Sequence, residues 1–303
     1  MKKLVISIIP IVILSLFLLA GCGPKPAGES GTEIIDAEEA LAMINEEGTV
    51  LVDAQNSEGY AAEHVQGAVS IARSEIVIMK PYPNLLAPAD VIENVMTSRG
   101  VSNDTMVVVY DNNKNMDSAR LWWTLKAYGH HKVKVVSGGL EALKAAGAET
   151  TTETSNPAPA LFKAGPLDES MIAKQSDLRR LINTPDPNTV LIDTRTLEEY
   201  NEGTIPGSKH LDFSGNNFKD NTYKPVQQIR IRYLEEGIDY DKTAIMYCKT
   251  SIRGAQTYLA LYNAGYRNLK LYDGAWVEWS ANPMNQIFIP EVPVQIIESS
   301  DNS

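Results

Sequence analysis

The residues best suited to do chemistry in this chain form one short segment that begins where an apolar run ends. Residues 243–247 read Thr-Ala-Ile-Met-Tyr, which indicates a short buried strand, and Cys248 follows them directly. A helical pattern begins just after Arg253. A loop that wraps over a helix N-terminus points backbone N–H groups inward, and the helix dipole adds positive potential there. Because such a place stabilises a thiolate, we predict covalent sulfur chemistry with Cys248 as the nucleophile.

The side chains around Cys248 are interpreted by their charge and their place in the loop. Arg253 and Lys249 are cationic, and we expect them to position an anionic substrate. Thr250 and Ser251 either hydrogen-bond the sulfur or complete the turn, and both interpretations stay open. A buried structural cysteine is the plainer alternative for Cys248. The candidate substrate loop comprises Lys249, Thr250, Ser251, Ile252 and Arg253.

Other polar and aromatic residues have structural interpretations. Asp193 and Arg195 follow an apolar run, and we interpret them as a buried pair that holds the base of the loop. His130 and His131 lie in a glycine-containing turn, where we expect them to be exposed. No cysteine or carboxylate cluster accompanies these histidines, so we expect no metal site, and no motif indicates a cofactor. We expect packing roles for the tryptophans, Trp122, Trp123, Trp276 and Trp279.

The first residues have the form of an export signal. Residues 1–3 are cationic, residues 4–19 are almost wholly apolar, and Leu19-Ala20-Gly21-Cys22 supplies small residues at the expected cut. The apolar run is short for a bilayer span, so an uncleaved anchor is the weaker alternative, beside a plain signal peptide. Leu-Ala-Gly-Cys resembles the lipobox of bacterial lipoproteins. The resemblance implies cleavage before Cys22, diacylglycerol on its sulfur, and an extracytoplasmic protein anchored by lipid to a membrane of the cell envelope.

Only two cysteines are present, and their compartment bears on their state. In an exported protein a Cys22–Cys248 disulfide is the simple expectation. If Cys22 carries lipid, however, Cys248 has no partner within the chain and becomes a candidate reactive thiol. The glycine- and proline-rich residues 23–31 indicate a flexible tether.

Length and charge limit the remaining possibilities. The chain has 303 residues, enough for two domains, and 44% of them are apolar, as in soluble globular proteins. The net charge is −11 and no basic stretch stands out, which argues against a nucleic-acid partner.

The body of the chain repeats itself at a spacing of about 140 residues. Leu51-Val52-Asp53 followed by Tyr60 matches Leu191-Ile192-Asp193 followed by Tyr200. Three further blocks match in the same order, so we predict two copies of one domain. The matched blocks are 106–111 with 244–248, 127–129 with 263–265, and 135–139 with 271–275.

Strands alternate with helices within each copy. This pattern predicts an α/β fold in which each domain is a mostly parallel sheet with helices on both faces, and ligands bind at the carboxyl ends of the strands. We expect helices over 37–46, 118–128, 176–183 and 254–263, and strands over 50–52, 106–110, 132–136, 190–192, 243–247 and 268–271. The expected organisation is a signal peptide with lipobox (1–21), a tether (22–31), a first domain (32–149), a linker (150–165), a second domain (166–285) and a tail (286–303).

Residues 32–285 resemble the tandem-domain rhodaneses, which are thiosulfate and mercaptopyruvate sulfurtransferases. The resemblance rests on the Cys248 loop, Leu-Ile-Asp-x-Arg at 191–195, Ile-Pro-Gly at 205–207, Leu-Trp-Trp at 121–123 and Ser-Gly-Gly at 137–139. It implies a catalytic second domain and an inactive first domain with Asp at the cysteine position, which Asp111 fits. It also implies that sulfane sulfur passes from a small anionic donor to a thiophilic acceptor, such as cyanide or a thiol, through a persulfide.

The chain departs from the family pattern in ways that bear on the substrate. Glu199 stands where many two-domain members have a substrate-binding arginine, and Thr204 replaces a frequent histidine. These changes disfavour mercaptopyruvate, whose carboxylate needs a cation, and leave thiosulfate as the expected donor. Alternatives are a non-enzymatic binding or sensing module, sulfur relay to a protein acceptor, and a cysteine-dependent phosphatase or arsenate reductase. The last normally has five residues between Cys and Arg, and here there are four.

Overall fold

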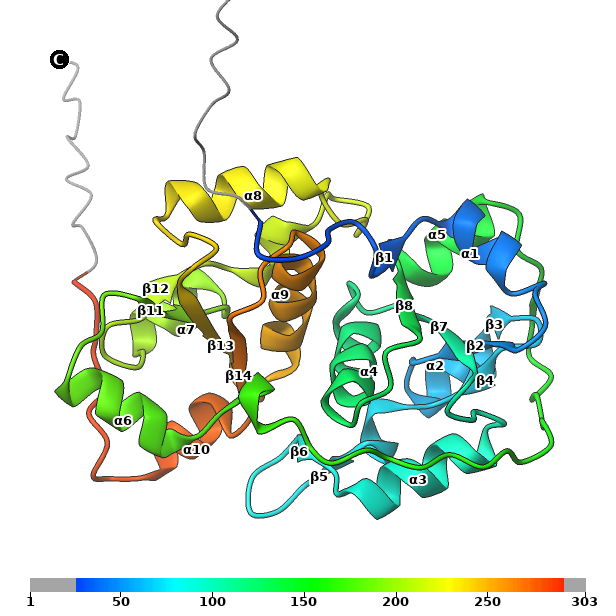
Figure 1. The fold of residues 1–303 in the computed structure, drawn as a ribbon, viewed down its shortest axis with the longest axis horizontal. Helices are drawn as coiled ribbons and strands as arrows, with labels where there is room; N and C mark the ends of the chain where they lie inside the picture. The colour runs from blue at the N-terminus through cyan, green and yellow to red at the C-terminus, as the bar shows by residue number, and fades with distance from the viewer. Residues whose placement is uncertain (1–25, 292–303) are drawn as a thin grey trace, which may run out of the picture.

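The first domain is built on a five-stranded sheet in which all the neighbouring strands are parallel. The computed structural model describes residues 26–291, and Figure 1 shows the two domains side by side. The sheet order is β1-β8-β7-β2-β4. Its strands are β1 (Ile34–Ile35), β2 (Thr49–Asp53), β4 (Val69–Ser70), β7 (Met106–Tyr110) and β8 (Val133–Val136).

The second domain repeats this sheet with the same order and direction. Its order is β10-β14-β13-β11-β12, again with parallel neighbours throughout. Its strands are β10 (Ile172–Ala173), β11 (Thr189–Asp193), β12 (Lys209–His210), β13 (Thr243–Tyr247) and β14 (Leu269–Tyr272). The prediction of two copies of one α/β domain with parallel sheets is therefore confirmed.

Helices cover both faces of each sheet because the buried strands carry apolar residues on both sides. In the first domain, Val107 and Val109 pack toward α4, while Val108 and Tyr110 pack toward α1 and α5. The helices of this domain are α1 (Ala37–Met43), α2 (Ser57–Ala62), α3 (Ala89–Ser98), α4 (Met116–Ala127) and α5 (Gly139–Ala145). Those of the second are α6 (Gln175–Asn183), α7 (Leu197–Glu202), α8 (Val226–Glu235), α9 (Ile252–Asn263) and α10 (Ala275–Ala281).

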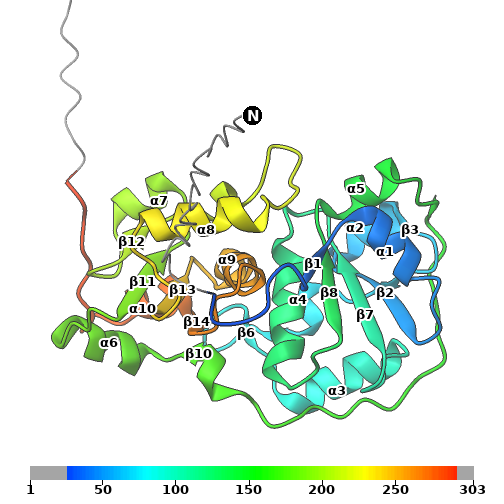
Figure 2. The ribbon, with the colours of Figure 1, turned by 45° about the horizontal axis from the view of Figure 1, so that its top comes forward.

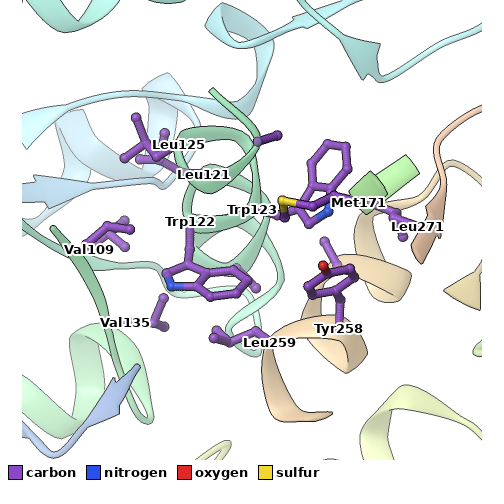
Figure 3. Packing of buried hydrophobic residues seen from close by; sticks show 14 of the residues in the cluster. Val109, Leu121, Trp122, Trp123, Leu125, Val135, Met171, Tyr258, Leu259 and Leu271 are labelled. Atoms are coloured by element: carbon purple, nitrogen blue, oxygen red, sulfur yellow. The ribbon is translucent and has the colours of Figure 1, made fainter. Parts of the chain in front are cut away.

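The two domains share one hydrophobic core. Helices α4 and α9 lie side by side between the two sheets in both views (Figures 1 and 2). Trp122 and Trp123 of α4 are fully buried and lie beside Tyr258 and Leu259 of α9 (Figure 3). The packing role expected for these two tryptophans is confirmed. It also holds for Trp279, whereas Trp276 is half-buried.

Short elements complete each domain. A hairpin of β5 (Val77–Ile78) and β6 (Leu85–Leu86) extends from the first domain beneath the second (Figure 1). Strand β9 (Thr150–Thr151) pairs with β3 (His64–Val65), so the predicted linker 150–165 begins as part of the first domain. Three short 3₁₀ helices are η1 (Arg73–Glu75), η2 (Glu169–Met171) and η3 (Phe213–Asn216).

The chain ends are described only in part. The predicted signal peptide, Cys22 and most of the C-terminal tail lie outside residues 26–291. Within the described range, no helix has both the length and the apolar character needed to cross a bilayer. The backbone N–H groups of Gly28 and Gly31 donate to the carbonyl oxygens of Gly265 and Asn263, at 3.1 and 2.8 Å. Residues 28 and 31, within the predicted tether, are therefore hydrogen-bonded to the end of α9 and the turn that follows it.

Two further predictions need correction. Helices α4 and α9 begin two residues earlier than predicted, because the last residue of each preceding loop adopts a left-handed conformation and starts the helix at once. His130 is buried rather than exposed, with its Nε2 3.1 Å from the Lys132 carbonyl oxygen and its ring against Phe162. Burial lowers the pKa of its imidazole.

Candidate active site

The Cys248 loop lies at the carboxyl edge of the second sheet. Cys248 directly follows β13, which is flanked by β11 and β14 within the sheet. Ser251 has φ +65° and is the N-cap of α9, so the chain turns from strand to helix within a few residues. This is the strand–loop–helix arrangement that the apolar run, the polar loop and the second helical pattern predicted.

The backbone of the loop has its carbonyl groups and its N–H groups in different environments. The N–H groups of Trp276 and Val277, at the start of α10, donate to the carbonyl oxygens of Cys248 and Lys249 at 2.9 and 3.2 Å. By contrast, none of the backbone N–H groups of residues 249–254 donates to a protein acceptor within residues 26–291. Unpaired N–H groups at a helix N-terminus are suited to hold an anion.

The Cys248 thiol is free and lies just below the protein surface. The residue is 1% exposed, but Lys249 beside it is exposed, and Thr250 and Arg253 are partly exposed. The thiol is therefore buried, next to loop residues that are themselves wholly or partly exposed.

Arg253 forms a two-pronged ion pair with Glu199. Its two terminal nitrogens donate to the two carboxylate oxygens of Glu199 at 2.5 and 2.9 Å. These hydrogen bonds lower the pKa of the Glu199 carboxyl to about 2, so it is ionised at neutral pH. Burial works against the charge of Arg253, but Glu199 and the neighbouring Cys248 outweigh it and raise the pKa of the guanidinium. Arg253 thus stands beside the sulfur as a permanent cation whose charge is balanced by Glu199.

Asp193 and Arg195 form a buried pair beneath the loop. The Arg195 Nη2 donates to Asp193 Oδ2 at 2.6 Å and to the Gly203 carbonyl oxygen at 2.6 Å. Asp193 Oδ2 also accepts from the Thr204 and Tyr247 hydroxyls, at 2.8 and 2.9 Å. Because Tyr247 immediately precedes Cys248, this network holds the strand end from which the loop departs.

The side chain of Ser251 takes part in the turn rather than in binding sulfur. Its hydroxyl lies 2.7 Å from the Thr250 carbonyl oxygen and 3.2 Å from Asp273 Oδ1, and it accepts from Arg120 at 3.1 Å. These contacts agree with the interpretation in which Ser251 completes the turn.

In the equivalent loop of the first domain, a carboxylate of the chain itself already binds the backbone N–H groups. Asp111 follows β7 as Cys248 follows β13, and its Oδ1 accepts from the N–H groups of Asn113 and Asn115 at 2.7 and 3.0 Å. Its Oδ2 accepts from the N–H and the hydroxyl of Ser118 at 2.8 and 2.9 Å. Asp117, two residues after the helix N-cap, stands at the position of Arg253. The loop therefore supplies its own anion.

Some features of the site could not be found from the sequence. Glu199 was noted only as a departure from a family pattern, and its pairing with Arg253 joins residues 54 positions apart. The face of Trp276 lies 4.4 Å from the Arg195 guanidinium carbon, and Tyr247 joins the Asp193 network. No local pattern signals such long-range contacts. Within the described residues, no three His, Cys, Asp or Glu side chains are grouped to hold a metal ion.

Comparison with known proteins gives clear relatives. The sulfur carrier protein TtuD of Thermus thermophilus is 31% identical over 203 residues, which cover 61% of this chain and 71% of that protein. The thiosulfate sulfurtransferase of Cricetulus griseus is 29% identical over 235 residues, covering 73% of this chain and 78% of that protein.

Solved structures share the fold at lower identity. The anaerobic ergothioneine biosynthesis enzyme of Chlorobium limicola, in complex with trimethyl histidine, has a TM-score of 0.76 at 19% identity. The match covers 86% of this chain and 71% of that one. A model of the rhodanese-like domain matches residues 36–146 and again residues 174–282. These two matches take up most of the described chain, and the protein belongs to the rhodanese family as a member with two tandem domains.

Proposed function

We propose that this protein is a sulfurtransferase that carries sulfane sulfur on Cys248. The observation that carries the proposal is the Cys248 loop itself, in which a free thiol lies among N–H groups without protein acceptors and beside Arg253. The sulfurtransferase and sulfur-carrier names of its relatives point the same way.

The reaction has two half-steps. The Cys248 thiolate attacks the outer sulfur of thiosulfate, a sulfur–sulfur bond forms, and sulfite leaves with the electron pair of the bond that breaks. The N–H groups of the loop stabilise the negative charge on the terminal persulfide sulfur. A thiophilic acceptor, cyanide or a thiol, then attacks that sulfur and restores the thiolate.

Thiosulfate is favoured over mercaptopyruvate as the donor. A carboxylate donor such as mercaptopyruvate is best held by an arginine of its own, and Glu199, which pairs with Arg253, stands where many two-domain members have that arginine. Exposed Lys249 provides a further positive charge near the entrance. A protein thiol is the second candidate acceptor, because one relative is named a sulfur carrier.

The test is mass spectrometry of the detergent-solubilised full chain after exposure to thiosulfate. We expect a gain of about 32 Da, one sulfur atom, on the peptide that contains Cys248, and no gain in the Cys248→Ser variant. A gain from mercaptopyruvate but none from thiosulfate would reverse the choice of donor. Phosphate release from an aryl phosphate, with no sulfur adduct, would favour the phosphatase alternative.

We also propose that the protein is held at a membrane of the cell envelope by lipid on Cys22. The support is the cationic, apolar and Leu-Ala-Gly-Cys order of residues 1–22. Cell fractionation provides the test, with wild-type protein expected in the membrane fraction. Cys22→Ser should then remain uncleaved and unlabelled by a fatty acid, and labelling equal to wild type would contradict the proposal.

A further inference from the structure

One buried cation of the first domain reaches the loop of the second. Arg120 of α4 is fully buried, and its Nη1 lies 3.1 Å from Ser251 Oγ and 2.8 Å from Asp273 Oδ1. Its Nη2 donates to the Asn84 carbonyl oxygen at 3.0 Å, and its guanidinium carbon lies 4.7 Å from the Trp123 ring centroid. Because Ser251 is the N-cap of α9, Arg120 binds the residue at which the catalytic loop becomes a helix.

Asp273 extends this contact to the other side of the loop. The residue follows β14, and its Oδ2 accepts from the Leu86 N–H of the first domain at 2.7 Å. Helix α10 begins two residues later at Ala275, and its first N–H groups bind the Cys248 and Lys249 carbonyl oxygens. Arg120 and Asp273 therefore connect both segments that support the loop, the start of α9 and the start of α10, to the first domain.

The corresponding residue of the second domain makes no such contact. Gln256 of α9 lies five residues after its helix N-cap, as Arg120 does in α4. Its Nε2 and Oε1 bind Asn217 and Asn216 of its own domain, at 2.9 and 3.0 Å. Within the described residues, a buried cation of the facing helix therefore contacts the Cys248 loop, whereas the residue at the same position of α9 does not contact the Asp111 loop.

The backbone conformation of Ser251 explains why the loop needs stabilising contacts from outside itself. A φ of +65° is unfavourable for a residue with a side chain, and it persists only where surrounding contacts fix it. The direction of the N–H groups at residues 249–254 depends on this turn. Without Arg120, the Asp273 carboxylate would also be left without its cation in a nearly closed site, where only 12% of its side chain is exposed.

We propose that Arg120 is a positioning residue for sulfur transfer, through which the first domain, itself without a nucleophile, holds the Cys248 loop in its reactive conformation. The inference rests on the proposed function of Cys248. It assigns the first domain a role in catalysis that its filled Asp111 loop does not suggest.

The test compares Arg120→Met with Lys126→Met in the detergent-solubilised full chain. Lys126 is a matched control because it is a second buried cation of α4, but it pairs with Glu33 at 3.0 Å instead of contacting the loop. Two quantities are measured at temperatures where each variant is folded. One is the rate of sulfite release from thiosulfate, and the other is the pH profile of alkylation of the Cys248 peptide without any donor.

We expect Arg120→Met to slow sulfite release per folded molecule about 10-fold or more, and to move the alkylation profile to higher pH. Lys126→Met should lose stability without either change. Equal rates and equal profiles in the two variants would overturn the proposal, since Arg120 would then act on stability alone.

A conservative variant keeps the proposal testable if Arg120→Met does not fold. Arg120→Lys retains the charge, but its single nitrogen cannot reach acceptors that lie around two separate nitrogens of the guanidinium, so we expect a smaller loss of the same two quantities. Unchanged quantities in that variant would contradict the proposal. The two measurements also distinguish failure of the proposed function from failure of this inference. Wild-type protein that releases no sulfite from thiosulfate would refute the proposed function. The alkylation profile needs no sulfur donor, so it tests the effect of Arg120 on Cys248 independently of that function.

Discussion

The Asp111 loop and the Cys248 loop follow equivalent strands and begin equivalent helices, yet they treat their N–H groups in opposite ways. The first binds the Asp111 carboxylate with three backbone N–H groups and one hydroxyl. The second leaves the N–H groups of residues 249–254 without a protein acceptor among the described residues. The same turn therefore binds a carboxylate of the chain itself in the first domain, and in the second it leaves its N–H groups available to an external anion.

The charges beside the two loops are also reversed. Arg253 stands two residues after the N-cap of α9, whereas Asp117 holds that place in α4. Burial and the nearby Asp111 raise the pKa of Asp117, so the first loop disfavours a further negative charge. The two loops therefore differ in the charge beside the helix start as well as at the position of the cysteine.

The first prediction places the aspartate of the first loop in the second loop, and it tests whether the difference between the loops depends on the residue at position 248. Cys248→Asp should abolish persulfide formation and reduce thiosulfate:cyanide turnover on the order of 10³-fold or more, because the nucleophile is gone. If the N–H groups bind the new carboxylate, this variant should be more stable than Cys248→Ser in urea denaturation. Turnover close to wild type in Cys248→Asp would show that another group carries the sulfur.

The second prediction concerns the base of the two loops. Asp193→Ala leaves the cation of Arg195 buried without its partner, and we expect the free energy of unfolding to fall by about 3–5 kcal/mol. Asp53, the equivalent residue, binds the neutral side chain of Gln55 at 2.8 Å, so Asp53→Ala should cost only about 1–3 kcal/mol. Urea denaturation measures both values. Equal losses would mean that the ion pair adds nothing to the hydrogen bonds.

The third prediction removes the internal anion of the first loop. Asp111→Ala leaves four donors without their acceptor in a buried place, which should lower the free energy of unfolding by about 2–3 kcal/mol. Asp111→Asn keeps one acceptor oxygen and should lose less. Thermal or urea denaturation provides the measurement, and an Asp111→Ala variant as stable as wild type would contradict the filled-loop interpretation.

Much of this fold follows from local sequence patterns. The apolar runs predicted β7 and β13 with their observed bounds. A strand that is buried on both faces is a continuous run of apolar residues, so its ends are visible where the run stops. The position of Cys248 at a strand end and the equivalence of Asp111 follow from the internal repeat. The helix starts were predicted two residues too late because neither Asn115 nor Ser251 is a glycine, the residue type that most often marks a left-handed position.

The parts that could not be predicted depend on contacts between distant segments. Arg120 is an ordinary helix residue in the sequence, and only the packing of α4 against α9 brings it to Ser251. The turn at His130 indicated exposure, but Phe162 from the following linker covers it. Residues 26–31 have a composition typical of flexible chain, yet they pair with the end of α9. In each case a contact between distant segments determines the environment of the residue, and the local sequence does not record that contact.

The fourth prediction concerns the ion pair that the second domain has and the first lacks. Gly59 holds the place of Glu199 in the first domain, so only the second loop has a carboxylate beside its helix start at this position. Glu199→Gln should lower the free energy of unfolding at neutral pH by about 1 kcal/mol, a modest value because the pair is partly exposed. Guanidinium would screen the ion pair, so urea is the suitable denaturant.

The pH dependence of this effect has a definite sign. The pKa of Glu199 falls from 4.5 to about 2 in the folded protein, chiefly through its hydrogen bonds with Arg253. Its contribution is therefore fully present above pH 4.5 and is lost as the pH falls through about 2, below which folded and unfolded chains are both protonated. The difference in stability between wild type and Glu199→Gln should shrink over this interval. Glu202→Gln, an exposed change on the same helix, should show no such trend, and a constant difference for Glu199→Gln would mean that its ion pair does not stabilise the site.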